Sequence, residues 1–590
     1  MNLSMLDWGI IFAFFAVTLF IGLYASRGAG KSYSEFFLSG RDMSWWLLGV
    51  SMVATTFSAD TPNLVTDLVR THGVAGNWSW WAFLLTGMLT VFVYARLWRR
   101  SGVLTDLEFY ELRYSGKPAA FLRGFRAIYL GVFLNVMIMA TVSLAAIKIG
   151  AVMLDLKPVE TLLITSIITV IYTSIGGLKG VVLTDFFQFI LAMAGMVIAA
   201  VYIVNLPEVG GLSKMLAHPN VSGKLNFLPD FSDSKQLIPL FLMPLAVQWW
   251  SVWYPGAEPG GGGYIAQRML SAKDEKNAVT ATLFFNIAHY ALRPWPWILI
   301  ALASLIVFPD IASLQAAFPH LDPKVVKNDL AFSAMLNLLP AGLIGLLIAA
   351  LLSAFMSTIS THLNWGSSYV LNDFYKRFLR PDAPQNELVN VGRISTVVLM
   401  IMAALLALAL ENALQAFNIL LQIGAGTGLI FILRWFWWRV NAYSEITAMV
   451  VSFMLALYFE LGMENPLPEH IKLLAGVGIT TLAWVTVTFL TAPSSQETML
   501  RFFKLIQPSP TGWKPVIEKG IASGELDSNE IIPGKLPNQI LGMFLGCILV
   551  YSALFSIGFI IYGNMMPALL SGFVALISGY LMLKNWDKIY

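Results

Sequence analysis

Apolar runs of about 20 residues recur along the whole chain, and each is long enough to cross a bilayer as an α-helix. Charged residues make up 12% of the 590 residues and hydrophobic residues 57%, whereas a soluble domain has about 25% charged residues. The sequence therefore predicts an all-α, polytopic membrane protein. This composition excludes a soluble enzyme, a nucleic-acid-binding protein and a disordered chain, and the unalternating runs exclude a membrane β-barrel.

We predict about 15 transmembrane helices, numbered in chain order, because each run reaches the length that a span needs. They lie near residues 8–25, 44–69, 75–98, 122–153, 159–176, 181–204, 236–266, 279–308, 330–372, 392–410, 414–438, 442–461, 470–491, 537–562 and 564–583. The first run has no basic leader and no small-residue cleavage site, so we interpret it as a retained span.

Basic residues alternate between the two sides of these spans. Every odd-numbered span is followed by a basic segment, such as Arg27 with Lys31 after span one, or Arg268 with Lys273 and Lys276 after span seven. Because Lys and Arg are enriched in cytoplasmic loops, we expect the N-terminus outside and the C-terminus inside a plasma (cytoplasmic) membrane. The net charge of +3 does not indicate a partner.

The hydrophilic segments do not resemble a catalytic domain. Residues 205–235 and 309–329 are expected outside, and residues 492–535, rich in Pro, Ser, Glu and Lys, are expected to form a partly ordered cytoplasmic linker. The single cysteine, Cys547, excludes an intrachain disulfide and a Cys-based metal site. No His, Asp and Glu cluster has metal-ligand spacing in the sequence, so we do not expect an enzyme.

Two spans carry helix-breaking residues near their middles. Span two contains VATTFSADTP at residues 53–62, and span seven contains YPGAEPGGGG at residues 254–263. Proline and glycine both disfavour regular helix, and unwound backbone in a membrane survives only inside protein or beside a wet cavity. The breaks lie five spans apart, so their helices cross in opposite directions. This pattern predicts two inverted five-helix repeats with a substrate site between them, although Pro and Gly are common in membrane helices anyway.

Polar residues inside two other spans suggest an ion site. Asp185 lies about one turn into span six, where a carboxylate is costly unless it has a partner such as a cation; it could also be an interfacial residue. Span nine contains hydroxyls at Ser357, Thr358, Ser360 and Thr361. Hydroxyl and carbonyl oxygens suit sodium, yet such hydroxyls also bond to their own helix or join neighbouring helices.

Arg293 lies in an otherwise apolar part of span eight, four residues after His289. Arginine stays charged. Its guanidinium could therefore extend to the membrane surface, pair with a buried acid such as Asp60 or Glu258, or contact an anionic part of a substrate. The sequence leaves these three alternatives open.

Several motifs together resemble the sodium/solute symporter family. They are FFLSGR at 36–41, LTDLEFYELRY at 104–114, GGLKGVVLTD at 176–185, YIAQRMLSAK at 264–273, the hydroxyl run of span nine with LNDFY at 371–375, and FWWRVN at 436–441. The resemblance covers about residues 8–445. It implies a five-plus-five inverted-repeat (LeuT-like) core in spans two to eleven, preceded by one helix.

The resemblance also implies sodium sites. The ligands of the site shared across the family would be the carbonyls of Ala54, Phe57 and Ala354 and the hydroxyls of Ser357 and Thr358. Members that use two sodium ions add an acid matching Asp185 and hydroxyls matching Ser360 and Thr361, with Ser357 shared. All of these residue types are present, so two Na⁺ per cycle would be consistent with the sequence.

The positions that select the solute differ from those of the sugar carriers. The sugar carriers have a glutamate near the position of Ser79 and a glutamine or histidine near that of Thr61, and this chain has neither. Arg293 lies within one position of a lysine that some sugar carriers have. Candidate solute-binding residues are Thr61, Ser79, Trp253, Tyr254, Glu258, Arg293, Asn418 and Gln422. The solute could be a sugar, a sugar acid or another organic acid.

These observations divide the chain into an N-terminal helix and loop (1–43), a first inverted repeat (44–204), an external loop (205–235), a second inverted repeat (236–440), two peripheral helices (441–491), a cytoplasmic linker (492–535) and two C-terminal helices (536–590). We expect a symporter that imports a small organic solute with sodium across a lipid bilayer by alternating access. An uncoupled uniporter or channel with the same fold is the alternative, and protons could replace sodium. The sequence does not indicate an oligomeric state.

Overall fold

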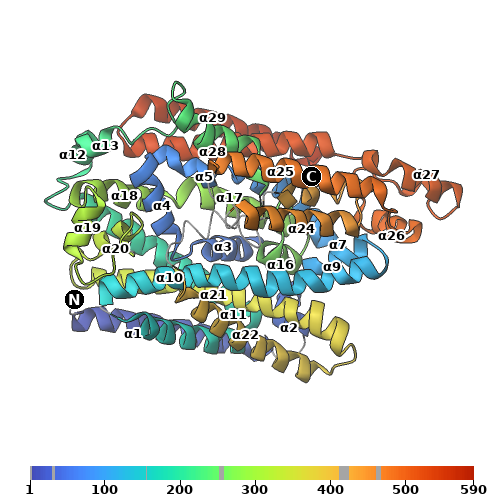
Figure 1. Ribbon diagram of the computed structural model, residues 1–590, viewed down its shortest axis with the longest axis horizontal. Coiled ribbons are helices and arrows are strands. Elements are labelled where there is room, and N and C mark those ends of the chain that lie inside the picture. The colour runs from blue at the N-terminus through green and yellow to red at the C-terminus, as the bar shows by residue number, and fades with distance from the viewer. Residues whose placement is uncertain are drawn as a thin grey trace.

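The computed structural model describes residues 3–29, 33–154, 156–251, 258–323, 325–410, 424, 426–459 and 467–589. Long helices run nearly parallel to the long axis of the molecule (Figure 1). Within these ranges no β-strand forms, apart from one isolated bridge between Met43 and Ala272. The all-α prediction is therefore confirmed.

Ten helical segments of the described ranges are long and apolar enough to cross a membrane. They are Met5–Ala25, Val74–Ser101, Gly116–Ala151, Gly176–Val204, Glu275–Val307, Leu343–Leu379, Gln385–Ala407, Glu469–Leu490, Leu536–Ile561 and Met565–Lys584. Shorter apolar helices are Trp45–Thr56, Pro158–Ile171 and Ala442–Leu457. This number is below 15 because broken spans divide into short pieces and because part of span eleven lies outside the described residues.

Predicted spans five and six form one helical run, α11 (Pro158–Val204), that turns sharply at Gly177. The φ angle of Gly177 is +55°, a left-handed conformation that glycine adopts without the clash a Cβ would cause. The part of α11 before Gly177 packs on α10 (Asn135–Leu154) and α22 (Gln385–Ala407). The part after Gly177 carries Asp185.

The break predicted in span two is present. Helix α3 (Trp45–Thr56) ends before Phe57, and α4 (Thr61–His72) begins after Asp60. Two local causes end α3. The hydroxyl of Thr56 donates to the carbonyl oxygen of Val53 at 2.9 Å, which competes for a helical acceptor. Pro62 then suits the first turn of α4, where its missing N–H costs nothing.

The second break is bounded by described residues on both sides. Residues 252–257 lie outside the described ranges, and regular helix resumes at α16 (Gly263–Ser271). Gly260 and Gly261 have φ angles of +88° and +78°. An added Cβ at Gly260 would lie 3.1 Å from the ring of Tyr94, so glycine permits both the turn and this close approach.

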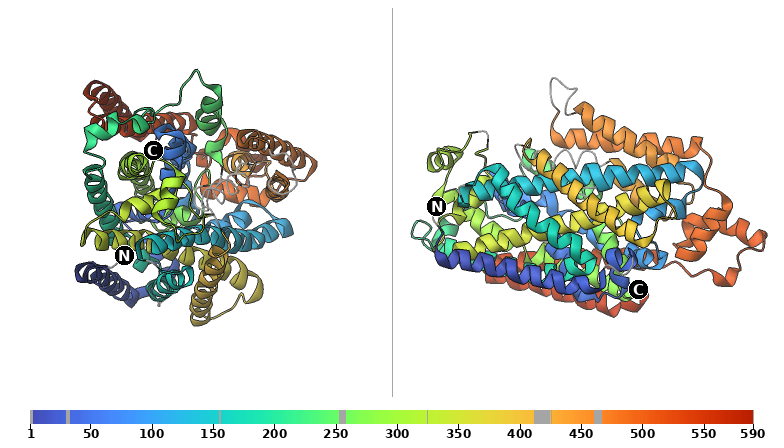
Figure 2. Two further views of the ribbon diagram at one scale, coloured as in Figure 1. Left: turned by 60° about the vertical axis from the view of Figure 1, so that its left-hand side comes forward. Right: turned by 90° about the horizontal axis from the view of Figure 1, so that it is seen from below.

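The segment 492–535 is folded, although we expected a partly ordered linker. It contains α26 (Gln496–Ile506) and α27 (Lys514–Ala522). These helices form one end of the molecule (Figure 2). The indole Nε1 of Trp513 donates to the carbonyl oxygen of Trp435 at 3.0 Å, and Arg100 donates to the last carbonyl of α26, at Ile506, also at 3.0 Å. The segment is thus docked on the core.

The N-terminus lies at the opposite end, which also carries α12 (Leu212–Ala217), α13 (Pro219–Ser222) and α19 (Ile311–Ala317) (Figures 1 and 2). Lys535 binds the carbonyl oxygen of Asp587 at 3.0 Å, so the C-terminal residues lie next to the 492–535 segment. The segments 205–235 and 309–329, which we expected outside, therefore lie at one end, and the segment 492–535, which we expected inside, lies at the other.

Candidate functional site

Helix α21 (Leu343–Ser368) meets the end of α3 at the first break. The hydroxyl of Thr358 donates to the carbonyl oxygen of Thr55 at 2.7 Å. Ala54 and Phe57 lie where α3 ends, whereas Ala354 lies one turn before Thr358, within the regular helix α21. The residues predicted to hold the shared-type sodium thus occur on two segments in direct contact.

Asp185 lies beside this contact. Its side chain is fully buried. The hydroxyl of Ser357 donates to Asp185 Oδ1 at 2.6 Å, and the hydroxyl of Ser51 donates to Oδ2 at 2.5 Å. Asp185 therefore lies inside the protein, and it joins α11, α3 and α21 in one polar cluster.

Arg268 belongs to the same cluster, which corrects its assignment to a basic loop after span seven. It lies on α16, its side chain is 0% exposed, and its Nη2 atom is 3.7 Å from Asp185 Oδ2. Nη2 also donates to the hydroxyl of Thr361 at 2.8 Å and to that of Ser51 at 3.2 Å. A buried guanidinium needs such partners, so the protein itself supplies a cation next to Asp185.

Of the two roles considered for the hydroxyl run, sodium binding and hydrogen bonding within the helix, Ser360 has the second in this structure. Its hydroxyl donates to the carbonyl oxygen of Ser357, on its own helix, at 3.1 Å. This is the local bond that Ser and Thr commonly make in membrane helices. Ser360 is the one proposed ligand of the second site whose hydroxyl is bonded back to its own helix.

A small polar cavity of about 40 Å³ lies next to the first break. It is lined by residues of α3, of spans three and eight and of the second break, among them Thr56, Thr86, Glu258, Asn286, His289 and Tyr290. A single water needs about 10–15 Å³ by this measure, so the cavity has room for only a few waters in this conformation. A sugar-sized solute requires the surrounding helices to separate.

Arg293 lies behind one wall of this cavity. Its Nη1 donates to the hydroxyl of Thr56 at 3.0 Å, and its Nη2 is 3.2 Å from His289 Nε2. Its Cζ lies 5.1 Å from the ring of Trp297, within range of a cation–π interaction. The side chain is 1% exposed, which excludes extension to the membrane surface in this conformation.

The other predicted solute residues are distributed unevenly. Glu258 lines the cavity. Thr61 begins α4, and the carbonyl oxygen of Ser79 accepts a hydrogen bond from Gln248 at 2.6 Å; neither residue lines the cavity. Four further candidates lie outside the described residues, namely Trp253, Tyr254, Asn418 and Gln422.

The sequence reasoning missed several cavity residues. Thr282, Asn286 and His289 precede Arg293 on span eight at intervals of three and four residues, which places all four on one face of a helix. This polar stripe could have been found from the sequence. Thr86 and Thr90 of span three carry no comparable signal, because isolated threonines are ordinary in membrane helices.

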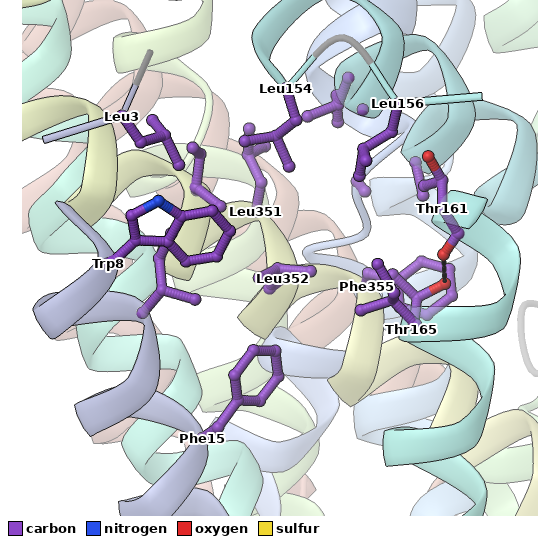
Figure 3. Close-up of a pocket in the computed structure, with 17 residues that line it drawn as sticks. Leu3, Trp8, Phe15, Leu154, Leu156, Thr161, Thr165, Leu351, Leu352 and Phe355 are labelled. Atoms are coloured by element: carbon purple, nitrogen blue, oxygen red, sulfur yellow. Dashed lines mark hydrogen bonds between the residues drawn. The ribbon is translucent and has the colours of Figure 1, made fainter. Parts of the chain in front are cut away.

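A larger cavity, about 410 Å³, lies between α1 (Met5–Ala29), α10, α11 and α21 (Figure 3). Its lining side chains are apolar except for Thr161, Thr165 and the indole of Trp8, and Trp8, Phe15 and Leu352 point into it. The hydroxyl of Thr165 is bonded to its own helix, at Thr161, at 2.8 Å. Among the described residues, none with a charged or carboxamide side chain lines this cavity, whereas Glu258 and Asn286 line the smaller one. Such groups orient a polar solute, so the smaller cavity is the candidate solute site.

The family model described as "Sodium:solute symporter family" matches residues 36–452. The chain belongs to this family. The match includes both breaks, Asp185 and the hydroxyl run of α21.

Individual relatives agree with this membership. The sodium/glucose cotransporter of Vibrio parahaemolyticus is 27% identical over 476 residues, covering 78% of this chain and 86% of that protein. The sodium/sialic acid symporter of Proteus mirabilis is 24% identical, covering 78% and 91%. A solved structure of a substrate-bound, outward-open Na⁺-coupled sialic acid symporter shares the fold, with a TM-score of 0.66 at 21% identity over 84% of this chain and 99% of that chain.

As a member of this family the chain is a sodium-coupled symporter in a membrane, not an enzyme. Sodium is its coupling ion and a small solute its cargo. The core is the inverted five-helix repeat with broken first helices. Nothing favours an uncoupled uniporter.

Proposed function

We propose that this symporter imports a small polar organic solute, a sugar, a sugar acid or another organic acid, and that the solute binds at the polar cavity beside the two breaks. The observation that carries this proposal is the position of the cavity. Thr56, the last residue of α3, lines it, and the next residue back, Thr55, accepts the hydrogen bond from Thr358. A sodium ion at the end of α3 would therefore order the residues that contact the solute.

We assign the shared-type sodium site to the carbonyls of Ala54, Phe57 and Ala354 and the hydroxyls of Ser357 and Thr358. Their closeness supports this assignment, because Thr358 already binds an α3 carbonyl at 2.7 Å. Hard cations prefer such oxygen ligands, and transporters bind sodium through unwound carbonyls. A second site would use Asp185, Ser357, Ser360 and Thr361.

The proposed cycle begins with sodium from outside, which would bridge α3 and α21 and stabilise an outward-open form. The solute then binds, the loaded protein closes on the outer side and opens on the inner side, and sodium leaves into a sodium-poor cytoplasm. The inside-negative potential adds about 2.3 kcal/mol per charge per 100 mV. Each further coupled ion would therefore steepen the accumulation of solute.

Polar solute chemistry follows from the cavity lining. The carboxylate of Glu258 and the Oδ1 atom of Asn286 are acceptors, while Asn286 Nδ2 and the Thr86 hydroxyl donate to the backbone carbonyls of Thr282 and Trp249. Acceptors of this kind fit the hydroxyl groups of a polyhydroxy compound. Arg293 provides positive charge behind Thr56 and His289, which would favour a carboxylate on the solute. Trp253, Tyr254, Asn418 and Gln422 remain candidate contacts, as do Thr61 and Ser79.

We also propose an orientation with the N-terminus outside and α26 and α27 inside. The basic residues around the inner ends of the spans support it. On this side Arg123 pairs with Asp373 at 2.7 Å, with Glu111 at 2.7 Å and with Glu108 at 3.3 Å. This network joins α8–α9 (Phe109–Arg113 and Gly116–Ile128) to the end of span nine, so it would close the inner side.

The test is solute uptake by purified protein in liposomes, with Asn286→Leu and His289→Leu beside the wild type. We expect sodium-dependent uptake of one solute class, and at least a tenfold rise in KM for each variant, because a buried polar contact is lost. The variant Thr165→Val, in the apolar cavity, should behave as the wild type. Equal effects of all three substitutions would contradict the location of the solute site.

A further inference from the structure

The Asp185 cluster already contains a cation. Asp185 on α11 lies next to Arg268 on α16. Ser51 of α3 and Thr361 of α21 both accept hydrogen bonds from the Arg268 guanidinium. Its Nη1 donates to Gln267 Oε1 at 3.0 Å. All of these groups are buried. Two of the proposed ligands of the second sodium, Asp185 and Thr361, thus interact with Arg268.

The positive charges of sodium and of the Arg268 guanidinium oppose the binding of both next to Asp185. One carboxylate balances one monovalent cation, and two cations beside it would repel each other strongly where water is absent. Thr361 offers its hydroxyl oxygen to Arg268 at 2.8 Å. A sodium ion bound to this oxygen would lie next to the guanidinium, so the repulsion between the two positive charges would favour its withdrawal.

We propose that Arg268 and sodium compete for Asp185, so that the second sodium binds only when Arg268 withdraws. Arg268 would then act as an internal cation that keeps Asp185 neutralised whenever the site holds no sodium. This inference rests on the proposed function, because it concerns the second ion of the same symporter. Arg268 is a positioning residue here, since it acts through Asp185.

The packing indicates how the exchange would be linked to transport. Arg268 and Ser51 lie on α16 and α3, the inner halves of the two broken spans, which pack against each other. Asp185 and Thr361 lie on α11 and α21, which also pack against each other. A movement of the first pair of helices relative to the second would separate Arg268 from Asp185. Sodium would then find a carboxylate without its internal partner.

The test measures sodium binding rather than uptake. Purified full-length protein is incubated with ²²Na⁺ and increasing unlabelled sodium, with choline chloride keeping the ionic strength constant, and bound ions are counted per protein. In Arg268→Gln we expect the half-saturating sodium concentration of the Asp185 site to fall about tenfold or more, since an adjacent opposite charge typically shifts a carboxylate equilibrium by about 1–3 log units. Asp185→Asn with Arg268→Gln should lose this tighter binding.

Arg268→Lys provides a second variant in case the glutamine variant does not fold. An ammonium cannot reach Ser51 and Thr361 in the forked geometry of a guanidinium, so we expect tighter sodium binding than in the wild type, by about threefold. Unchanged or weaker sodium binding in both variants would overturn the competition. Sodium binding that is absent from the wild type and from every variant would instead overturn the proposed sodium sites, and the competition with them.

Discussion

The hydroxyl of Thr358 on α21 donates a 2.7 Å hydrogen bond to the carbonyl oxygen of Thr55, one residue before α3 ends. Because α3 stops at Thr56, the carbonyls around this point lack the full helical set of donors. The contact therefore places a side-chain hydroxyl of one repeat against freed backbone of the other. This is the arrangement that a sodium ion would need in order to link the two repeats.

Thr358→Val should remove the hydroxyl while keeping the shape of the side chain. We expect the sodium concentration for half-maximal uptake to rise at least tenfold, because a ligand is lost, and the free energy of unfolding to fall by about 1 kcal/mol with the lost hydrogen bond. Thr358→Ser keeps the hydroxyl and serves as the matched control. Uptake by the valine variant with the sodium dependence of the wild type would exclude Thr358 as a ligand.

Gly87→Ala should block the solute site selectively. A Cβ at Gly87 would lie 1.8 Å from Oδ1 of Asn286, so the carboxamide must move, and both residues line the cavity. We expect solute uptake to fall at least tenfold while ²²Na⁺ binding is unchanged, since the sodium ligands lie on other helices. Gly9→Ala on α1, with no heavy atom within 4 Å of its added Cβ, should leave both unchanged. Normal uptake by Gly87→Ala would place the solute elsewhere.

Arg123→Ala should destabilise the inner end of the protein. Asp373 is 0% exposed, and Arg123 binds it at 2.7 Å, so the substitution leaves a buried carboxylate without that partner. Loss of one member of a buried pair costs about 3–5 kcal/mol, which thermal unfolding would detect. Arg377→Ala is the matched control. Its pair with Glu111 is at the surface, with the arginine 45% exposed, so it should cost about 1 kcal/mol or less. Equal losses for both would contradict the structural role of the Arg123 network.

Gly512→Ala should undock the segment 492–535. An added Cβ would lie 1.7 Å from the carbonyl oxygen of Phe436, and the carbonyl of Gly512 binds Trp438 N at 3.1 Å. We expect faster limited proteolysis within residues 523–535 and a loss of about 1–3 kcal/mol, the usual cost of an overpacked contact. Gly223→Ala, which meets no heavy atom within 4 Å, is the control. Proteolysis at the wild-type rate would show that the docked arrangement tolerates the change.

The sequence was sufficient for the architecture and for the first break. Pro62 and the preceding hydroxyl residues end α3 where expected, because local backbone chemistry alone decides this point. The apolar spacing of Met499, Phe502, Phe503 and Ile506 on α26 also follows a helical period. That pattern was available in the sequence, and it was hidden only by the Pro- and Ser-rich residues around it.

Arg268 shows what the sequence could not supply. Its position near the end of a span is typical of a cytoplasmic loop cation, and charge counting assigns it there. Helix α16 continues to Ser271, however, and Asp185 reaches Arg268 from another helix. A pairing between residues so distant in the chain depends on tertiary packing. The same reason hid Thr86 and Thr90, which become polar cavity walls only when span eight lies opposite them.

Solute-stimulated uptake of ²²Na⁺ into liposomes that contain the purified protein tests the central claim most directly. The panel holds sugars, sugar acids and other organic acids, and each hit is repeated as labelled solute uptake in sodium and in choline. Counting sodium itself detects coupling even when the cycle moves no net charge. The account predicts that one solute class accelerates ²²Na⁺ entry and is accumulated only in sodium. A solute that enters at equal rates in sodium and in choline, without moving ²²Na⁺, would contradict it.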